Sequence, residues 1–416
     1  MPFVSHSQNT IQVFEYQTIR VGDMVNGIRF EETAFRALAI YQEKQAVKYY
    51  SLVYNGVKFS HYVGIIQIGI LTIEILPKAD KVDLADKGRW QQVLIEMLRY
   101  CQLLKIEAFG YGQVQLTPNN ILVLYLNRLL DQIKQLLNKG LPKKYLSNTE
   151  NLKVLKGRLD LPKHLRKNLL HPERFYVNYQ TYKTNHLFNQ VLYEVLKVLQ
   201  KIRLNPSLKL KLNWVYDCFP KQTNYLVQPK DFEALFAQQK YKPYSELLEL
   251  SRLILFNFSP DIQGGKHHLF ALLFDMNKLF EEYVFWQLKR LESVDFKVQR
   301  HTSKPFWQRR VIRPDLLIEI KGKKIILDTK WKIMKNVSPN MEDLKQMYIY
   351  CQYFGADQAI LLYPDVFQIP NSKMTPFQPT HTIHKPINTQ VVFLKIVDES
   401  GKLNKNLGAN LLPTLT

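Results

Sequence analysis

Residues 311–330 of the chain read VIRPDLLIEIKGKKIILDTK. Residues 311–320 and 325–327 form two largely apolar, β-branched runs, and the polar residues 321–324 between them include a glycine. This pattern predicts one strand over each run and a tight turn between them. The turn brings the second strand back beside the first, so charged side chains on the two strands can come close together.

Two carboxylates and a lysine lie on this predicted hairpin. Asp315 is on the first strand, and the triplet Asp328-Thr329-Lys330 begins thirteen residues later on the second. Because side chains alternate along a strand, Asp328 and Lys330 are expected on one face and Thr329 on the other. Carboxylates are typical Mg²⁺ ligands, and an ammonium group can orient water or stabilise charge on a phosphate.

Metal-dependent phosphodiester hydrolysis needs these residue types in this arrangement. A surface hairpin with solvated charges has the same local pattern. Asp315 and Asp328 both adjoin apolar runs, and a carboxylate next to buried strands is costly unless something pairs with it. This placement favours a functional site.

Composition sets the broad class. The chain has 416 residues, of which 46% are hydrophobic and 12% aromatic, enough for two or three folded domains. The formal net charge of +21 favours a polyanionic partner such as nucleic acid, although a lysine-rich chain can be basic without binding DNA. Three scattered cysteines form no disulfide framework. With no signal peptide or membrane span expected, we predict a cytoplasmic protein.

The periodicity of apolar residues predicts an α+β chain with several domains. Residues 1–87 are expected to be β-rich and residues 88–265 mostly helical. Residues 266–416 alternate helices and strands, which predicts an α/β domain with a mixed sheet flanked by helices.

The helices expected on either side of the hairpin carry polar groups that could join the site. Glu281 and Glu282 lie on the preceding helix, and one of them could reach a metal, although solvated helix glutamates are more common. Gln346 and Tyr350 on the following helix are four residues apart and share a face. They could contact the DNA backbone, position the lysine, or serve only as a structural pair.

A basic cluster surrounds the hairpin. Such residues hold a nucleic acid through its phosphates without reading its sequence, and a generic solvated basic surface is the alternative. The candidates for DNA contact are Arg309, Arg310, Arg313 and Lys332.

The order of these elements resembles the PD-(D/E)XK nuclease superfamily: a helix with glutamate, an acid, a turn, acid-x-lysine, then a helix with Gln-x-x-x-Tyr. More closely, the chain resembles the McrC family, the nuclease subunits of McrBC restriction systems that act on 5-methylcytosine DNA. One departure is Lys183-Thr184-Asn185, where an acidic residue is expected before a helix. The motifs that carry the likeness outside the hairpin are residues 62–66, 71–78, 157–159, 185–189 and 275–284.

The resemblance implies a role for each residue of the site. Asp315 and Asp328 would be metal ligands together with the carbonyl oxygen of Thr329. Lys330 would activate or orient the attacking water, and Glu281 would be an accessory ligand or organise water. Gln346 and Tyr350 would support them. The implied cofactor is Mg²⁺, one ion or two, with Mn²⁺ as a substitute.

The resemblance also implies partners. Members of this family bind an AAA+ GTPase ring of the McrB type and stimulate its nucleotide hydrolysis, and the β-rich N-terminal domain would be the docking element. The substrate would be modified double-stranded DNA, cut by two copies acting together, with no membrane involved.

Two other functions remain open on the sequence. The chain could be mainly a regulatory adaptor that activates the motor, with nuclease activity lost or secondary. It could also be a plain DNA-binding protein, whose binding would depend on salt but not on metal.

Overall fold

The computed structural model describes residues 9–44, 47–77, 86–101, 120–262, 267–378 and 386–415. Lys78, the last residue of the N-terminal motif, lies outside them. The described residues form eleven α-helices and several mixed sheets, an α+β architecture. The chain divides into two compact units, Met1–Ile121 with Ala271–Thr416 (unit 1) and Leu122–Phe270 (unit 2). The predicted N-terminal segment and most of the predicted C-terminal segment therefore fall in one unit.

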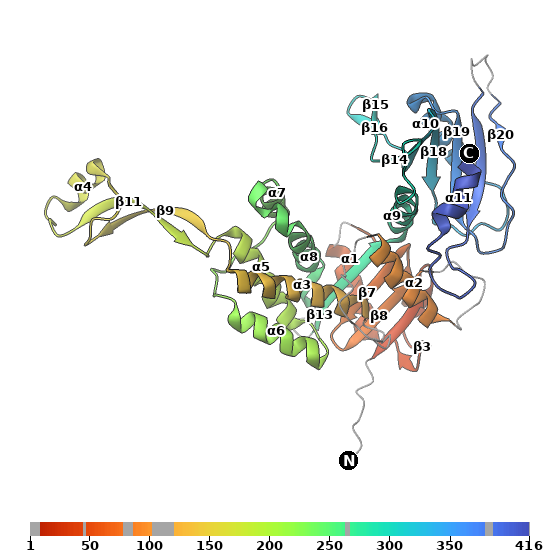
Figure 1. Cartoon of the computed structure of the whole chain (residues 1–416). Coiled ribbons are helices and arrows are strands. Elements are labelled where there is room, and N and C mark those ends of the chain that lie inside the picture. Colours follow the sequence, from red (N-terminus) through yellow and green to blue (C-terminus); the bar gives the residue numbers. More distant parts are fainter. Residues whose placement is uncertain are drawn as a thin grey trace. The chain divides into compact units, whose positions relative to one another are not determined.

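The N-terminal part of unit 1 is β-rich. In its main sheet β1 is parallel to β8, β8 is antiparallel to β7, and β13 follows beyond β7 (Figure 1). Gly64 in β7 has a φ of 134°, and a Cβ at this position would lie 2.1 Å from the carbonyl oxygen of Leu272 in β13. Only glycine permits this close approach. The elements are β1 (Thr10–Phe14), β2 (Thr18–Arg20), β3 (Met24–Val25), β4 (Ile28–Arg29), α1 (Glu32–Lys44), β5 (Tyr50–Val53), β6 (Gly56–Phe59), β7 (Tyr62–Ile68), β8 (Leu71–Leu76), α2 (Lys87–Tyr100) and β13 (His267–Asp275).

The C-terminal part of unit 1 is a six-stranded mixed sheet with the order β14-β17-β18-β19-β21-β20. β14, β17 and β18 are antiparallel neighbours, whereas β18, β19 and β21 are parallel. Helix α10 packs Met347 and Phe354 against Ile326 of β18 and Leu361 of β19. The elements are α9 (Met276–Lys289), β14 (Phe296–Arg300), β15 (Lys304–Trp307), β16 (Arg310–Ile312), β17 (Leu316–Ile320), β18 (Lys323–Thr329), α10 (Met341–Phe354), β19 (Gln358–Pro364), β20 (Thr375–Pro376), β21 (Asn388–Leu394) and α11 (Leu407–Leu415).

The predicted hairpin forms, with one correction. We expected a single strand over 311–320, but β16 ends at Ile312 and β17 begins at Leu316. Pro314 lies in the break, and proline cannot donate a hydrogen bond to a central ladder. The turn is at Lys321 and Gly322, whose φ values are 48° and 81°, as in the type I′ turns that suit hairpins.

Unit 2 combines helices with an arm of antiparallel strands. β9 and β11 pair along nine residues each, with β10 and α4 at the far end of the arm (Figure 1). We did not predict β9 and β11 within the helical middle segment. The sequence of β9, KYLSNTENL, has no buried position, and a strand without a buried face lacks the alternation that identifies strands in a sequence. The elements are α3 (Asn120–Lys139), β9 (Lys144–Leu152), β10 (Arg158–Leu159), α4 (Leu161–Asn168), β11 (Phe175–Lys183), α5 (Leu187–Lys201), α6 (Pro206–Cys218), α7 (Pro229–Phe236), α8 (Ser245–Phe256) and β12 (Phe258–Ile262).

Within the described part of the chain, no helix combines the length and the hydropathy that crossing a bilayer requires.

A buried hydrogen bond between Trp331 and Glu15 joins the two parts of unit 1. The indole Nε1 of Trp331 donates to Oε1 of Glu15 over 2.6 Å, and the two residues are 316 positions apart. Their side chains are almost completely buried, and the ring of Phe280 in α9 makes an edge contact with the indole at 5.3 Å. Since Trp331 directly follows Lys330, this bond fixes the end of the segment that carries the lysine.

Trp331→Phe is expected to destabilise the protein by about 1–3 kcal/mol, because it removes the indole donor from a buried carboxylate. Chemical denaturation of Trp331→Phe, Glu15→Gln and the double variant measures the interaction as a double-mutant cycle. We expect Trp331→Phe to cost less in the Glu15→Gln background. Equal costs in both backgrounds would show that the charge of Glu15 adds nothing to the bond, because the glutamine carbonyl oxygen can still accept from the indole.

Candidate active site

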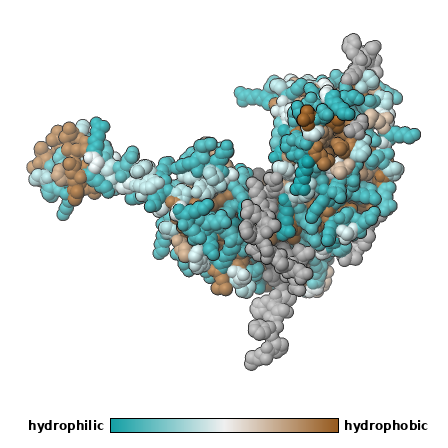
Figure 2. Space-filling model, in the orientation of Figure 1, coloured by the Kyte–Doolittle hydropathy of each residue, from teal (hydrophilic) through white to brown (hydrophobic). Residues whose placement is uncertain are grey.

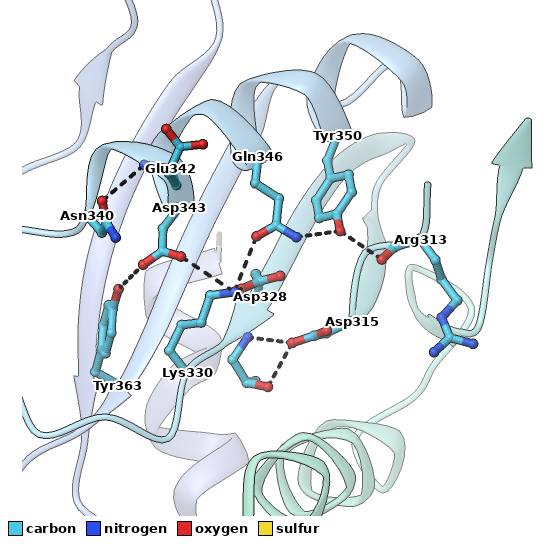
Figure 3. A network of polar contacts seen from close by, with 11 residues as sticks. Arg313, Asp315, Asp328, Lys330, Asn340, Glu342, Asp343, Gln346, Tyr350 and Tyr363 are labelled. Atoms are coloured by element: carbon cyan, nitrogen blue, oxygen red, sulfur yellow. Dashed lines mark hydrogen bonds and ion pairs between the residues drawn. The ribbon is translucent and has the colours of Figure 1, made fainter. Parts of the chain in front are cut away.

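Asp315 and Asp328 lie opposite each other at one end of the hairpin. Leu316 pairs with Leu327 in the antiparallel register, so the next positions outward are Asp315 and Asp328. Directly opposed residues have Cβ atoms about 4.5–5.5 Å apart. The backbone N–H and the hydroxyl of Thr329 both donate to Oδ2 of Asp315, over 2.7 and 2.8 Å, and hold its carboxylate in place (Figure 3).

Lys330 is held by three oxygen-bearing side chains. Its Nζ lies 2.7 Å from Oδ2 of Asp328 and 3.7 Å from Oδ1 of Asp343, and it donates to Oε1 of Gln346 over 3.2 Å. Burial alone would lower the pKa of Lys330, but the charges of Asp328, Asp343 and Asp315 offset it and the pKa is raised. Lys330 is therefore a fixed ammonium group at neutral pH and cannot act as a base there.

Helix α10 supplies a chain of hydrogen bonds that orients this lysine. The amide nitrogen of Gln346 donates to the hydroxyl of Tyr350 over 2.7 Å, and that hydroxyl donates to the carbonyl of Arg313 over 2.9 Å (Figure 3). The helix is positioned by Asn340, which caps its N-terminus, and by Gly355, which ends it with a φ of 65°. The two residues expected to share a face do so, and they link Lys330 to the segment before Asp315.

Asp343 is a site residue that our sequence analysis missed. It lies on α10 one turn before Gln346, contacts Lys330, and accepts a hydrogen bond of 3.4 Å from the hydroxyl of Tyr363. The spacing Asp343, Gln346, Tyr350, which places three polar groups on one helical face, was the signal available in the sequence.

The two glutamates of α9 have separate surroundings. Glu282 forms an ion pair with Arg300. The pKa of Glu281 is raised to about 7, first by burial and then by the charge of Asp315, with Glu282 and Asp328 adding to it and Arg313 opposing it. Glu282 is therefore paired with Arg300, whereas Glu281 responds to the charge of Asp315.

The acids concentrate negative charge in a buried place. Asp328 is 2% exposed, and its pKa is raised to about 7, first by burial and then by Asp315, with Lys330 opposing the shift. A divalent cation would relieve this repulsion. Among the described residues no group of three or more His, Cys, Asp or Glu side chains is arranged as a metal cage. Mg²⁺ usually needs only one or two carboxylates, with water and phosphate oxygens completing its shell, and Asp315 with Asp328 fits that pattern.

The raised pKa values predict how cation binding depends on pH. Below about pH 7, Asp328 and Glu281 keep protons that a cation must displace, so Mg²⁺ affinity should fall by up to about tenfold per pH unit and proton. Calorimetry in buffers of different ionisation enthalpy measures the protons released. Glu319→Gln on β17 is the control, and affinity equal at pH 6 and pH 8 would contradict the site.

The folded-state pKa of Asp328 is raised from 3.8 to about 7, so this group's contribution to folding is fully present below about pH 4 and is lost progressively as pH rises to about 7. In chelator, Asp328→Asn should therefore raise the melting temperature at pH 8 and have little effect at about pH 4. Scanning calorimetry at the two pH values tests this. A lower melting temperature at pH 8 would be the opposite result.

The four predicted DNA-contacting residues are all exposed. Arg309 lies in the turn between β15 and β16, and Arg310 begins β16; both are exposed, as is Arg313. Lys332 is exposed and lines a pocket of about 920 Å³ together with Lys330 and other residues of unit 1. All four face solvent and are free to meet a phosphate backbone.

Comparison with known proteins gives one family and one fold. The sequence matches the family model described as McrBC 5-methylcytosine restriction system component over residues 57–364. No curated protein matches the chain. A solved structure described as a refined half-complex from the tetradecameric assembly of Thermococcus gammatolerans McrB AAA+ hexamers with bound McrC is similar, with a TM-score of 0.68 and 17% identity, covering 98% of this chain and 100% of that chain. The cryo-EM structure of the Thermococcus gammatolerans McrBC complex gives a TM-score of 0.51 and 19% identity, covering 68% and 88%.

Proposed function

Because the chain belongs to the McrBC 5-methylcytosine restriction system component family, we propose that it is the Mg²⁺-dependent DNA endonuclease subunit of such a system. Its C-terminal sheet, with α9 and α10, is proposed as a PD-(D/E)XK nuclease domain. The observation that carries the proposal is the opposed pair Asp315 and Asp328 beside a charged Lys330.

In the proposed reaction the side chains divide the work. Asp315 and Asp328 would hold Mg²⁺, or Mn²⁺ in its place, and the Thr329 carbonyl would be a further ligand. When bound, the cation supplies a Lewis acid for the phosphate and lowers the pKa of water. Lys330 presents its ammonium group to the attacking water and to the charge that develops on the phosphate. Glu281 lies on helix α9, which precedes the acids in the sequence, and orders water.

The remaining polar residues position these groups. Gln346 and Asp343 hold the ammonium of Lys330, and Tyr350 ties Gln346 to the segment before Asp315. Arg309, Arg310, Arg313 and Lys332 bind the DNA backbone. The test is cleavage of methylated DNA by the purified chain with its motor partner, nucleotide and Mg²⁺, comparing wild type with variants of Asp328 and Lys330.

The proposed partner is an AAA+ GTPase ring of the McrB type, whose nucleotide hydrolysis this chain stimulates. Solved assemblies of similar chains contain such hexamers. The arm of unit 2 offers a surface for it in addition to the N-terminal β-rich domain. Figure 2 shows an apolar patch at the end of the arm, and a large exposed apolar patch on a folded protein marks an interaction site. Its large apolar side chains, each more than half exposed, are Val154, Leu155, Leu161, Leu165, Leu169 and Leu170.

We propose that two copies of the chain act together on modified double-stranded DNA, each cutting one strand. As a regulatory adaptor, the alternative function, the chain would bind the AAA+ partner through the same surface. Only the nuclease function needs Asp315 and Asp328.

A further inference from the structure

A small hairpin next to the proposed nuclease site exposes aromatic side chains. It consists of residues 304–312, the strands β15 and β16 with their turn, and we call it the aromatic hairpin. In Figure 1 it projects away from the six-stranded C-terminal sheet. Phe306, Trp307 and Val311 are 48%, 58% and 57% exposed. An isolated two-stranded hairpin is marginally stable in water, and these apolar groups gain nothing from exposure.

The aromatic hairpin is attached to the helix that orients Lys330. The ammonium of Lys304 donates to the carbonyl of Tyr353 over 2.6 Å, and the rings of Phe306 and Tyr353 lie 5.4 Å apart. Tyr353 is on α10, less than one turn beyond Tyr350. The base of the hairpin is therefore fixed on the same helix as the proposed site.

The aromatic hairpin also lies close to the proposed scissile phosphate along the chain. Arg310 precedes Asp315 by five residues, which span at most about 17 Å when extended. Successive nucleotides of one strand rise about 3.4 Å. If a phosphate of one DNA strand lies at Asp315, nucleotides up to about five positions along that strand lie no farther from Asp315 than the greatest possible distance of Arg310.

Its chemistry is that of a stacking platform with cations at its rim. The guanidinium of Arg310 lies 5.8 Å from the centre of the Trp307 ring, and Arg309 is exposed in the adjoining turn. Aromatic rings between arginines bind unstacked bases, while the arginines bind phosphates. A fully stacked duplex offers no base face, whereas an opened one does.

We propose that the aromatic hairpin binds DNA that is opened or distorted beside the cleavage site, with Trp307 stacked on an unpaired base and Arg309 and Arg310 on phosphates. The inference rests on the proposed nuclease function. It adds that the DNA substrate is opened or distorted beside the cleavage site. An apolar protein surface would satisfy Trp307 and Phe306 but would leave the arginines without acidic partners, so the charge favours DNA.

The test uses the full chain in chelator, so that DNA is bound but not cut. The probes are a short matched duplex and the same duplex with a central mismatched bubble that contains 2-aminopurine. Trp307→Ala should weaken bubble binding about tenfold and remove the change in 2-aminopurine fluorescence, with the salt dependence of binding unchanged. Trp307→Phe should restore most of the affinity. Arg310→Ala should lower the salt slope by about one.

Trp214→Ala is the matched control, because Trp214 is also an exposed tryptophan with a cation, Lys134, 5.1 Å from its ring. It should bind both probes like wild type. Unchanged bubble affinity and fluorescence in Trp307→Ala would overturn the proposal. Normal DNA binding by Trp307→Ala with weakened self-association or partner capture would assign the hairpin to a protein. If wild type binds neither probe at low salt, the proposed nuclease function itself fails.

Discussion

Asp328→Asn and Lys330→Ala should each reduce cleavage of methylated DNA by about a thousandfold or more, in a reaction with the AAA+ partner, GTP and Mg²⁺. Asparagine keeps the shape of Asp328 but removes the charge that would hold a cation between it and Asp315. Alanine at position 330 removes the only ammonium group that contacts Asp328 among the described residues. Initial rates of plasmid linearisation measure both effects.

Two controls separate loss of chemistry from loss of structure or of partner. Both variants should bind the partner and stimulate its nucleotide hydrolysis like wild type. Asp343→Asn should lose less, about tenfold to a hundredfold, because Asp343 acts only through Lys330. Full cleavage by Asp328→Asn and Lys330→Ala would contradict the nuclease assignment. A wild-type chain that stimulates hydrolysis but cuts no DNA with any divalent cation would favour the adaptor.

The part of the site that could be predicted depends on local spacing. The turn after β17 sets the register that places Asp315 opposite Asp328, and a turn of polar residues with glycine is visible in the sequence. Gln346 and Tyr350 share a helical face for the same reason, since four residues make about one turn. Such relations need no knowledge of the rest of the fold.

The part that could not be predicted depends on contacts between distant segments. Glu282 pairs with Arg300 on β14, whereas the charge of Asp315 contributes to the raised pKa of Glu281, and nothing in the helix sequence specifies this difference. The bond from Trp331 to Glu15 spans almost the whole chain. Pro314 alone would predict a break in the strand. The apolar residues 311–312 and 316–318 nevertheless suggest one continuous strand.

The strands in the arm of unit 2 could not be predicted from the sequence for a different reason. β9 has no buried position and β11 has one, Val177, so their mutual pairing along nine positions holds them more than a buried face does. Hydrophobic periodicity reflects which positions of a segment are buried. It therefore does not identify strands that are exposed to solvent on both faces. The valine and leucine side chains of the arm that are more than half exposed lie between Val154 and Leu170, at the end of the arm.

Replacing the two most exposed leucines of that patch, Leu169 and Leu170, with aspartate should abolish stimulation of the AAA+ partner. Burying one leucine contributes about 1.5–3 kcal/mol, so losing two from an interface lowers affinity by about a hundredfold or more. Nucleotide hydrolysis by the partner, titrated with this chain, measures the loss. DNA cleavage should fall in parallel, since translocation by the motor would no longer reach the nuclease.

The fold should tolerate these substitutions, because Leu169 and Leu170 are 78% and 86% exposed and exposed positions away from special features have small effects on stability. Leu226→Asp changes an equally exposed leucine of unit 2 outside the arm and should stimulate the partner normally. If the Leu169 and Leu170 variant also stimulates normally, docking belongs to another surface, and the β-rich N-terminal domain becomes the next to test. If Asp328→Asn and Lys330→Ala lose cleavage but keep stimulation, while the arm variant loses both, the two activities reside in separate units of one chain and cleavage depends on stimulation.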